Sequence, residues 1–182
     1  MIGPAGAAGR ILLCAMLLSG VAAAPVIASP SKQTDPVAQR AAFAVAEAKT
    51  MRKRGQRVWC VPFARTASGI EIKGNAVTWW AKAKGLYNRG NEPAVGAVMA
   101  FDATRKMRMG HVAVVSRVVN DRIILIDHAN WKRNEVSLNM AVVDVSRAGD
   151  WSAVRVESQP GVLGAVYPVN GFIYAPGGVA SR

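Results

Sequence analysis

Cys60 and the two histidines of this sequence have the side-chain types that nucleophilic catalysis requires. Cys60 lies in the segment WCVPFAR, and the only histidines are His111 and His128. The thiolate is the attacking form of cysteine, and an imidazole can accept the thiol proton. If Cys60 is a nucleophile, its base is therefore one of these two histidines. The alternatives are a small buried apolar role for Cys60 and hydrogen-bonded structural roles for the histidines.

The residues around Cys60 favour an ionised thiol. Pro62 is typical of a first helical turn, so we expect a helix over 60–68 with Cys60 near its start and Gly69 at its end. Four cations precede this helix, which are Arg52, Lys53, Arg54 and Arg57. Because helix N-termini and nearby cations both lower the pKa of a thiol, we expect the pKa of Cys60 to lie below its ordinary value.

The first histidine begins a strand-like segment. His111 starts HVAVV, in which strand alternation places His111, Ala113 and Val115 on one face. Gly110 precedes it, and a residue without a side chain permits the close approach of another backbone or of a ligand. We therefore expect His111 to project into a cleft at one end of a sheet.

The second histidine lies in IDHANW, which offers three candidates for orienting a catalytic imidazole. Alternation directs His128 and Asn130 to one face of the strand, and Asp127 and Trp131 to the other. A cysteine–histidine pair needs a third group that holds the imidazole through its second nitrogen. His128 and Asn130 are placed to provide it, and Asp127 reaches His111 only if a bulge turns the strand. The alternative is a strand end with turn-forming polar residues.

The elements that must position these residues form two groups. Ala-rich and capped segments predict helices over 38–54, 60–68 and 74–84. β-branched apolar segments predict strands over 95–101, 111–119, 121–131, 151–157 and 170–175. Asn120 and Asp121 predict a tight hairpin turn between the second and third of these strands. Helices followed by antiparallel strands favour an α+β fold.

Several segments in order resemble the family of CHAP domains, the cysteine, histidine-dependent amidohydrolases and peptidases. These segments are WCVPFAR, GNAVTWW, PAVGAVMAF, GHVAVV, IDHANW and NGFIY, which together span roughly residues 57–175. The resemblance implies a papain-like α+β fold, with N-terminal helices packed on an antiparallel sheet of about five to six strands. It also implies Cys60 as the nucleophile and His111 as the general base. The family's orienting position is usually an acid two residues before an asparagine; here it holds His128, followed by Asn130.

The resemblance further implies the substrate and the reaction. The substrate class is peptidoglycan, cut either as an N-acetylmuramoyl-L-alanine amidase or as a stem-peptide endopeptidase. Four tryptophans could line a groove for the substrate, although tryptophans at such spacing more often lie in a core; they are Trp59, Trp79, Trp80 and Trp131. We expect no cofactor, no metal and a monomer.

The first residues predict export. Arg10, the apolar stretch 11–18 and a small-residue tail are typical of a signal peptide over 1–28, with an uncleaved membrane anchor as the alternative. A linker over 29–37, a helix over 38–56, a catalytic domain over 57–176 and a tail over 177–182 are expected to follow. Cleavage would remove Cys14 and leave Cys60 as the only cysteine. We expect a periplasmic or extracellular protein with no stable membrane insertion after the signal is removed.

Composition and charge narrow the function further. The chain has 182 residues, of which 51% are hydrophobic, so it has the material for one folded domain. Its net charge is +12, and losing Arg10 with the signal leaves +11. A basic surface suits an anionic cell envelope, but it also suits nucleic acid. We expect no nucleic-acid partner, because the basic residues are scattered and no nucleic-acid motif is present. The main alternative function is a non-catalytic envelope-binding or scaffolding protein that keeps the fold.

Overall fold

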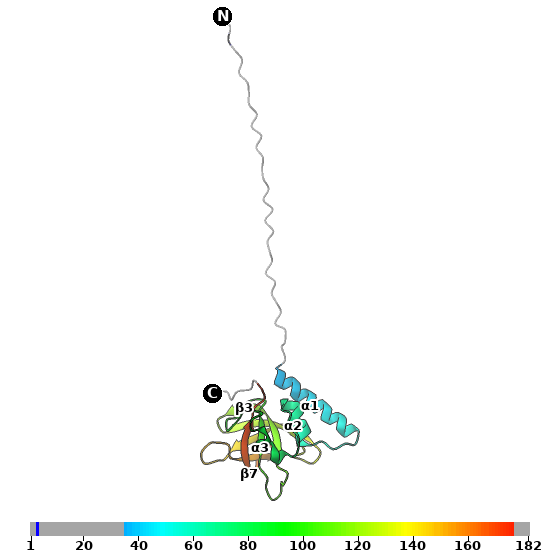
Figure 1. Ribbon diagram of the computed structural model, residues 1–182, viewed down its shortest axis with the longest axis vertical. Coiled ribbons are helices and arrows are strands. Elements are labelled where there is room, and N and C mark those ends of the chain that lie inside the picture. Colours follow the sequence, from blue (N-terminus) through cyan, green and yellow to red (C-terminus); the bar gives the residue numbers. More distant parts are fainter. Residues whose placement is uncertain (1–2, 4–34, 177–182) are drawn as a thin grey trace. The chain divides into compact units, whose positions relative to one another are not determined.

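The computed structural model describes Gly3 and residues 35–176 of the chain (Figure 1). Residues 35–176 lie within one compact unit. This unit has an α+β fold, as predicted, and in the described residues all helices precede the strands. The helical elements are α1 (Pro36–Lys53), α2 (Cys60–Ser68), the 3-10 turn η1 (Ala76–Thr78) and α3 (Trp79–Ala83). The strands are β1 (Arg89–Gly90), β2 (Val98–Phe101), β3 (His111–Asn120), β4 (Ile123–Ala129), β5 (Val136–Asp144), β6 (Ala153–Gln159) and β7 (Val162–Ile173).

Local signals set the helix limits. Asp35 caps α1 by accepting a hydrogen bond from the Val37 N–H at 2.9 Å, and Pro36 occupies the first turn. α2 spans the predicted 60–68 and ends at Gly69, whose φ of 75° few residues other than glycine adopt readily. The segment expected as one helix over 74–84 is divided instead into η1 and α3.

The strands form a closed antiparallel barrel. The order is β7–β2–β3–β4–β5–β6, and β6 also pairs with β7, which closes the ring; β1 pairs with β7 as an addition. The predicted strand segments omit β5, whose apolar pattern is interrupted by Asn139, and the short β1, and the segment 170–175 covers only the end of β7. Closure leaves few exposed strand edges in the barrel.

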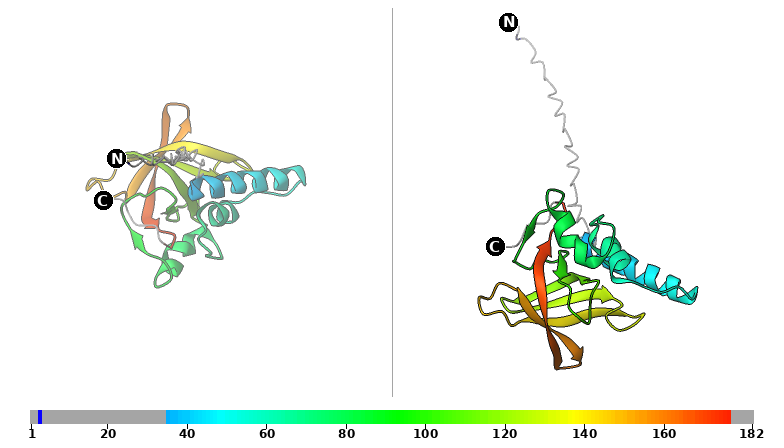
Figure 2. Two further views of the ribbon diagram at one scale, coloured as in Figure 1. Left: turned by 90° about the horizontal axis from the view of Figure 1, so that it is seen from above. Right: turned by 60° about the horizontal axis from the view of Figure 1, so that its bottom comes forward.

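Two apolar cores lie on opposite faces of the barrel wall, and β3 contributes to both. Val112 and Val114 face the helices, while Ala113 and Val115 face the barrel interior, as alternation predicted. The helices lie together on one side of the barrel (Figure 2). This arrangement allows the start of α2 to reach the barrel wall where β3 begins.

The hairpin of β3 and β4 brings the two histidine segments together. The strands turn at residues 121–122, as predicted, and Val114 pairs with Asp127. The start of β3 and the end of β4 therefore lie at the same end of the barrel. His111 and His128 meet there although 17 positions separate them in the sequence.

The predicted segment boundaries are tested only in part. The signal peptide over 1–28 and the tail over 177–182 lie outside the described residues, apart from Gly3. The linker was expected to end at residue 37, but α1 already begins at Pro36. Across residues 35–176, no helix combines the length and the apolar character needed to cross a membrane.

Candidate active site

Cys60 is the first residue of α2 and lies against the start of β3. The preceding Trp59 is extended, with a φ of −128° and a ψ of 151°, so the chain enters the helix at Cys60. Backbone hydrogen bonds from Val112, Val61 and Cys60 itself reach the sulfur. Val112 directly follows His111, so the sulfur lies beside the backbone that carries this histidine.

The pKa of the thiol differs from the sequence-based prediction. Burial raises the pKa of Cys60, and this effect exceeds the opposing one of the three backbone hydrogen bonds. The upstream cations do not contribute to the pKa of the thiol; the Arg57 guanidinium lies 4.2 Å from the centre of the Trp59 ring. The prediction of a lowered pKa was wrong because sequence proximity does not place the cations near the sulfur.

We therefore expect slow alkylation of Cys60 at neutral pH. The rate of reaction with iodoacetamide should rise with pH to a midpoint above about 8.5, because the thiolate is the reactive form. The same protein unfolded in urea should show the ordinary midpoint, and this serves as the control. A midpoint in the folded protein below that of the unfolded protein would contradict the effect of burial.

His111 projects into the end of the barrel and contacts the second histidine. Its ring is 4% exposed and packs against Phe101 and Trp131 at centroid distances of 5.6 and 5.0 Å. The Nε2 atom lies 3.0 Å from Nδ1 of His128. Burial first, and the neighbouring His128 second, hold the pKa of His111 well below its usual range. This contact involves Nε2 and leaves Nδ1 of His111 without a contact to His128.

His128 is the most enclosed polar side chain of the site. It is 0% exposed, and its ring stacks on Trp131 at a centroid distance of 5.4 Å. Its Nε2 atom lies 3.2 Å from Sδ of Met140 on β5. Burial lowers the pKa of His128 to about 3. The two histidines are therefore neutral at pH 7.

Two buried neutral histidines make the fold acid-labile. A histidine whose folded pKa is depressed binds its proton more readily in the unfolded state, so stability is lost as pH falls below about 6.5. We expect each histidine to remove about 1.4 kcal/mol of unfolding free energy per pH unit below that point. Urea unfolding between pH 7 and 4 measures this slope. His128→Asn should reduce the slope; an unchanged slope would contradict the low pKa of His128.

The two other candidates for the orienting role do not contact His111. Asn130 Oδ1 accepts from the Asn134 N–H at 2.9 Å, and Asn134 Oδ1 accepts from the Val58 N–H at 3.0 Å. Asp127 Oδ1 accepts from the Asn139 N–H at 2.8 Å. A register shift between Ile126 and His128 does occur in the pairing of β4 with β5. The shift does not bring Asp127 to His111, so His128 alone among the three candidates contacts the imidazole.

Trp131 lies on the histidine side of the strand, which corrects the simple alternation. The φ of Asn130 is 62°, in the left-handed region, and this turns the next residue back towards the site. Trp131 consequently packs against both histidines and against Tyr167, with a centroid distance of 4.9 Å to Tyr167. It covers the imidazole pair with an apolar surface.

The other three tryptophans have different surroundings. Trp59 is 47% exposed and lies next to Cys60. Trp79 is 0% exposed and belongs to the helix-side core, so it cannot line a groove in this structure. Trp80 is covered by the Arg89 guanidinium, 4.4 Å from the ring centre. Trp79 is therefore a core residue, and its predicted role in lining a substrate groove was wrong.

A pocket of about 280 Å³ opens beside the sulfur. It is mainly apolar, and its lining residues are Trp59, Cys60, Val61, Pro62, Gly74, Asn75, Ala76, Met109 and Gly110. Half-exposed Trp59 and Met109 contribute apolar surface to it. The pocket thus brings the start of α2 together with the residues directly before His111. Sequence reasoning missed Met109, as well as Asn134 and Met140, because none of them belongs to a recognisable motif.

Gly110 is needed for the approach that the sequence predicted. Its φ is 65°, and a Cβ there would meet the backbone N and Cα of Val77 at 2.7 and 2.8 Å. We expect Gly110→Ala to lower the free energy of unfolding by about 2–4 kcal/mol, from backbone strain and overpacking. Thermal unfolding measures the loss, and Gly55→Ala is a control for positive φ, since no atom lies within 4 Å there. Equal losses in both variants would show that close packing at Gly110 adds nothing.

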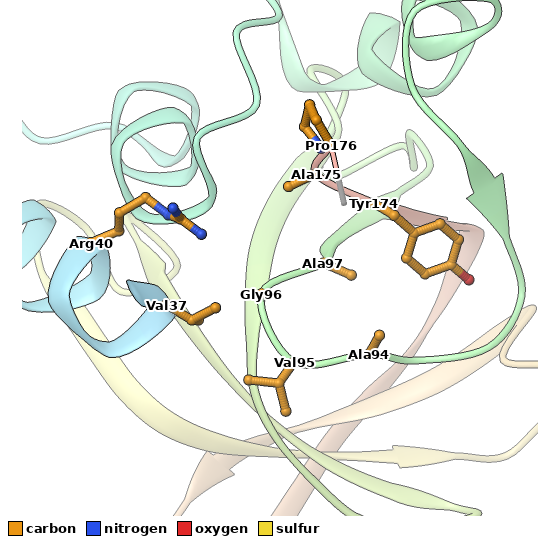
Figure 3. A pocket seen from close by; sticks show the side chains of 9 residues that line it. All are labelled: Val37, Arg40, Ala94, Val95, Gly96, Ala97, Tyr174, Ala175 and Pro176. Atoms are coloured by element: carbon orange, nitrogen blue, oxygen red, sulfur yellow. The ribbon is translucent and has the colours of Figure 1, made fainter. Parts of the chain in front are cut away.

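A second pocket of about 270 Å³ lies between the start of α1 and segments 94–97 and 174–176 (Figure 3). Its Arg40 side chain runs past Gly69, at the end of α2 opposite to Cys60. No cysteine or histidine lines this pocket. Within residues 35–176, no three histidine, cysteine, aspartate or glutamate side chains are grouped as a metal site would require. The candidate active site is therefore the one at Cys60.

A comparison with protein-family models identifies the same part of the chain. The family model described as CHAP domain matches residues 51–130. The matched segment runs from the end of α1 to Asn130, so it includes Cys60, His111 and His128. A search of curated proteins finds no match. Domains of this type are typically hydrolytic amidases or peptidases, which indicates a function in peptidoglycan hydrolysis. Residues 51–130 of the chain are thus similar to the CHAP domain family.

Proposed function

We propose that this protein is an exported cysteine hydrolase that cleaves amide bonds in peptidoglycan, with Cys60 as nucleophile and His111 as general base. One observation carries the proposal. The Cys60 sulfur lies at the start of α2, within hydrogen-bonding reach of the backbone of Val112, the residue directly after His111, and Nε2 of His111 lies 3.0 Å from Nδ1 of His128. This arrangement supports the proposed roles of Cys60 as nucleophile, His111 as base and His128 as orienting group.

The proposed reaction is acyl transfer. Nδ1 of His111 takes the proton from the Cys60 thiol while the sulfur attacks the amide carbonyl carbon. The C–N bond then breaks, and His111 returns the proton to the leaving amine. Water, activated by His111, cleaves the resulting thioester and restores the thiol. Because burial raises the pKa of Cys60 and lowers that of His111, the resting pair is neutral, and the proton moves during the attack.

Backbone groups are available for the developing negative charge. The N–H groups of Cys60 and Val61 lie at the N-terminus of α2, where the first helical donors have no helical acceptor. Such donors stabilise the oxyanion of the tetrahedral intermediate, and one of them contributes about 3 kcal/mol in known enzymes. We assign the oxyanion site to this end of α2.

The resemblance to the family and the sequence support the proposed substrate and location. A papain-like arrangement, with the cysteine on a helix and the histidine on the sheet, is the fold that we propose for this domain. The apolar pocket at Trp59 and Met109 would hold a small stem-peptide side chain. The net charge of +11 after loss of a signal peptide supports a role at the anionic cell envelope, in the periplasm or outside the cell. We propose that the protein acts there as a monomer.

Digestion of purified peptidoglycan tests the proposal. The mature protein should release soluble fragments, and mass analysis identifies the bond that is cut. New free lactyl groups on the glycan indicate an amidase, whereas new N-termini within the stem peptide indicate an endopeptidase. Binding without any released fragment, unchanged in Cys60→Ala, would instead support a non-catalytic envelope-binding protein.

A further inference from the structure

Met140 lies outside the matched residues but touches the histidine pair. It belongs to β5, pairs with Ile126 of β4 and is 8% exposed. Its Sδ atom lies 3.2 Å from Nε2 of His128. A thioether sulfur has no proton and can only accept a hydrogen bond. The contact is therefore a hydrogen bond only when His128 carries its proton on Nε2.

The position of this one proton determines the rest of the chain of contacts. A neutral imidazole has one donor and one acceptor nitrogen, so Nδ1 of His128 must accept. Its partner at 3.0 Å is Nε2 of His111, which must then donate. A neutral His111 with its proton on Nε2 has an unprotonated Nδ1. This nitrogen holds the lone pair that the Cys60 thiol needs.

We propose that Met140 is a positioning residue that sets the tautomers of His128 and His111, so that the unprotonated Nδ1 of His111 serves Cys60. The consequence for catalysis rests on the proposed function, but the tautomers themselves do not. Within residues 35–176, Nε2 of His128 contacts no acceptor other than Met140. The carboxyl group of Asp127, which is adjacent in the sequence, accepts a hydrogen bond from Asn139. The opposite tautomers would place a lone pair of His128 against the Met140 sulfur and a proton on Nδ1 of His111, which could then not accept the thiol proton.

Histidine tautomers can be measured directly in the unaltered protein. The chain has two histidines, so 15N labelling of histidine with long-range 1H–15N correlation yields two ring systems. A single His128→Asn variant assigns them. At pH 7 we expect both rings in the neutral form with the proton on Nε2. A proton on Nδ1 of either ring in the native protein would overturn the proposal.

Two substitutions of similar length separate this role from simple packing. Met140→Leu keeps the volume but removes the acceptor, whereas Met140→Gln supplies a carbonyl oxygen that can accept from His128. In the leucine variant the fraction of His111 with the proton on Nε2 should fall to about half, and kcat should fall with it by about two-fold with KM little changed, as expected for the loss of one weak hydrogen bond. The glutamine variant should retain the native tautomers although a buried amide makes it less stable.

A packing role and a tautomer-setting role therefore predict opposite rankings of Met140→Leu and Met140→Gln. A packing role predicts that leucine is better than glutamine in every measurement. A tautomer-setting role predicts that glutamine is better in the NMR spectrum and in kcat, and worse in thermal stability. Native tautomers in Met140→Leu would overturn the proposal. Native tautomers in a protein without hydrolase activity would instead overturn the proposed function and leave the role of Met140 intact.

Discussion

Replacing Cys60 with alanine is expected to lower the rate of peptidoglycan hydrolysis by at least about 10⁴-fold, because a covalent route ends when its nucleophile is removed. No second cysteine lies within residues 35–176. The backbone donors at the start of α2 remain in the variant, so any residual rate reports their contribution. Release of soluble fragments from purified peptidoglycan, followed over time, measures the effect.

Folding has to be separated from chemistry in this variant. Cys60 is partly buried at the margin of the helix-side core, and loss of its sulfur should cost about 1 kcal/mol of stability. Cys60→Ser keeps a side chain of similar size with a much weaker nucleophile, so it should fold normally and be nearly inactive. Hydrolysis by Cys60→Ala within ten-fold of the native rate would exclude Cys60 as the nucleophile.

The second large effect is expected at His128. His128→Ala should lower kcat by about 10²- to 10³-fold, because His111 would lose the group that holds its Nε2 atom and orients its ring. KM should change much less, since His128 is fully buried and does not line the pocket. Steady-state kinetics on a soluble muropeptide gives both constants.

Matched variants distinguish the three candidates for this role. Asp127→Asn keeps an acceptor for the Asn139 N–H and should leave kcat within about two-fold of the native value. Asn130→Gly keeps the left-handed backbone and removes the contact to Asn134, so its effect should be far smaller than that of His128→Ala. His128→Asn should recover part of the lost rate. A larger loss in Asp127→Asn than in His128→Ala would assign the orienting role to the carboxylate.

Local signals in the sequence were sufficient for the parts of the site that depend on near neighbours. Pro62 and Gly69 delimit α2, so the start of that helix at Cys60 could be predicted. Alternation along HVAVV predicted which face of β3 holds His111, and the turn after Asn120 predicted the hairpin. The missing side chain of Gly110 predicted a close backbone approach, which the Val77 backbone provides.

Alternation failed where the backbone leaves the strand conformation. The left-handed φ of Asn130 turns Trp131 onto the histidines, and that of Asn139 interrupts the pattern of β5. Asparagine tolerates this region without requiring it, so no sequence rule distinguishes these asparagines from others. The same limit explains why Asn130 was a plausible orienting residue although its side chain holds the loop at Asn134.

The sequence by itself determined the inventory of the site: one thiol and two imidazoles, the helix that begins at the thiol, and the strands that carry the imidazoles. Only the tertiary structure decided the contacts between them. His128 meets His111, Met140 meets His128, and burial rather than the upstream cations controls the pKa of Cys60. The physical reason is that hydrogen-bond partners and desolvation depend on which strands close the barrel, and this pairing joins residues far apart in the chain.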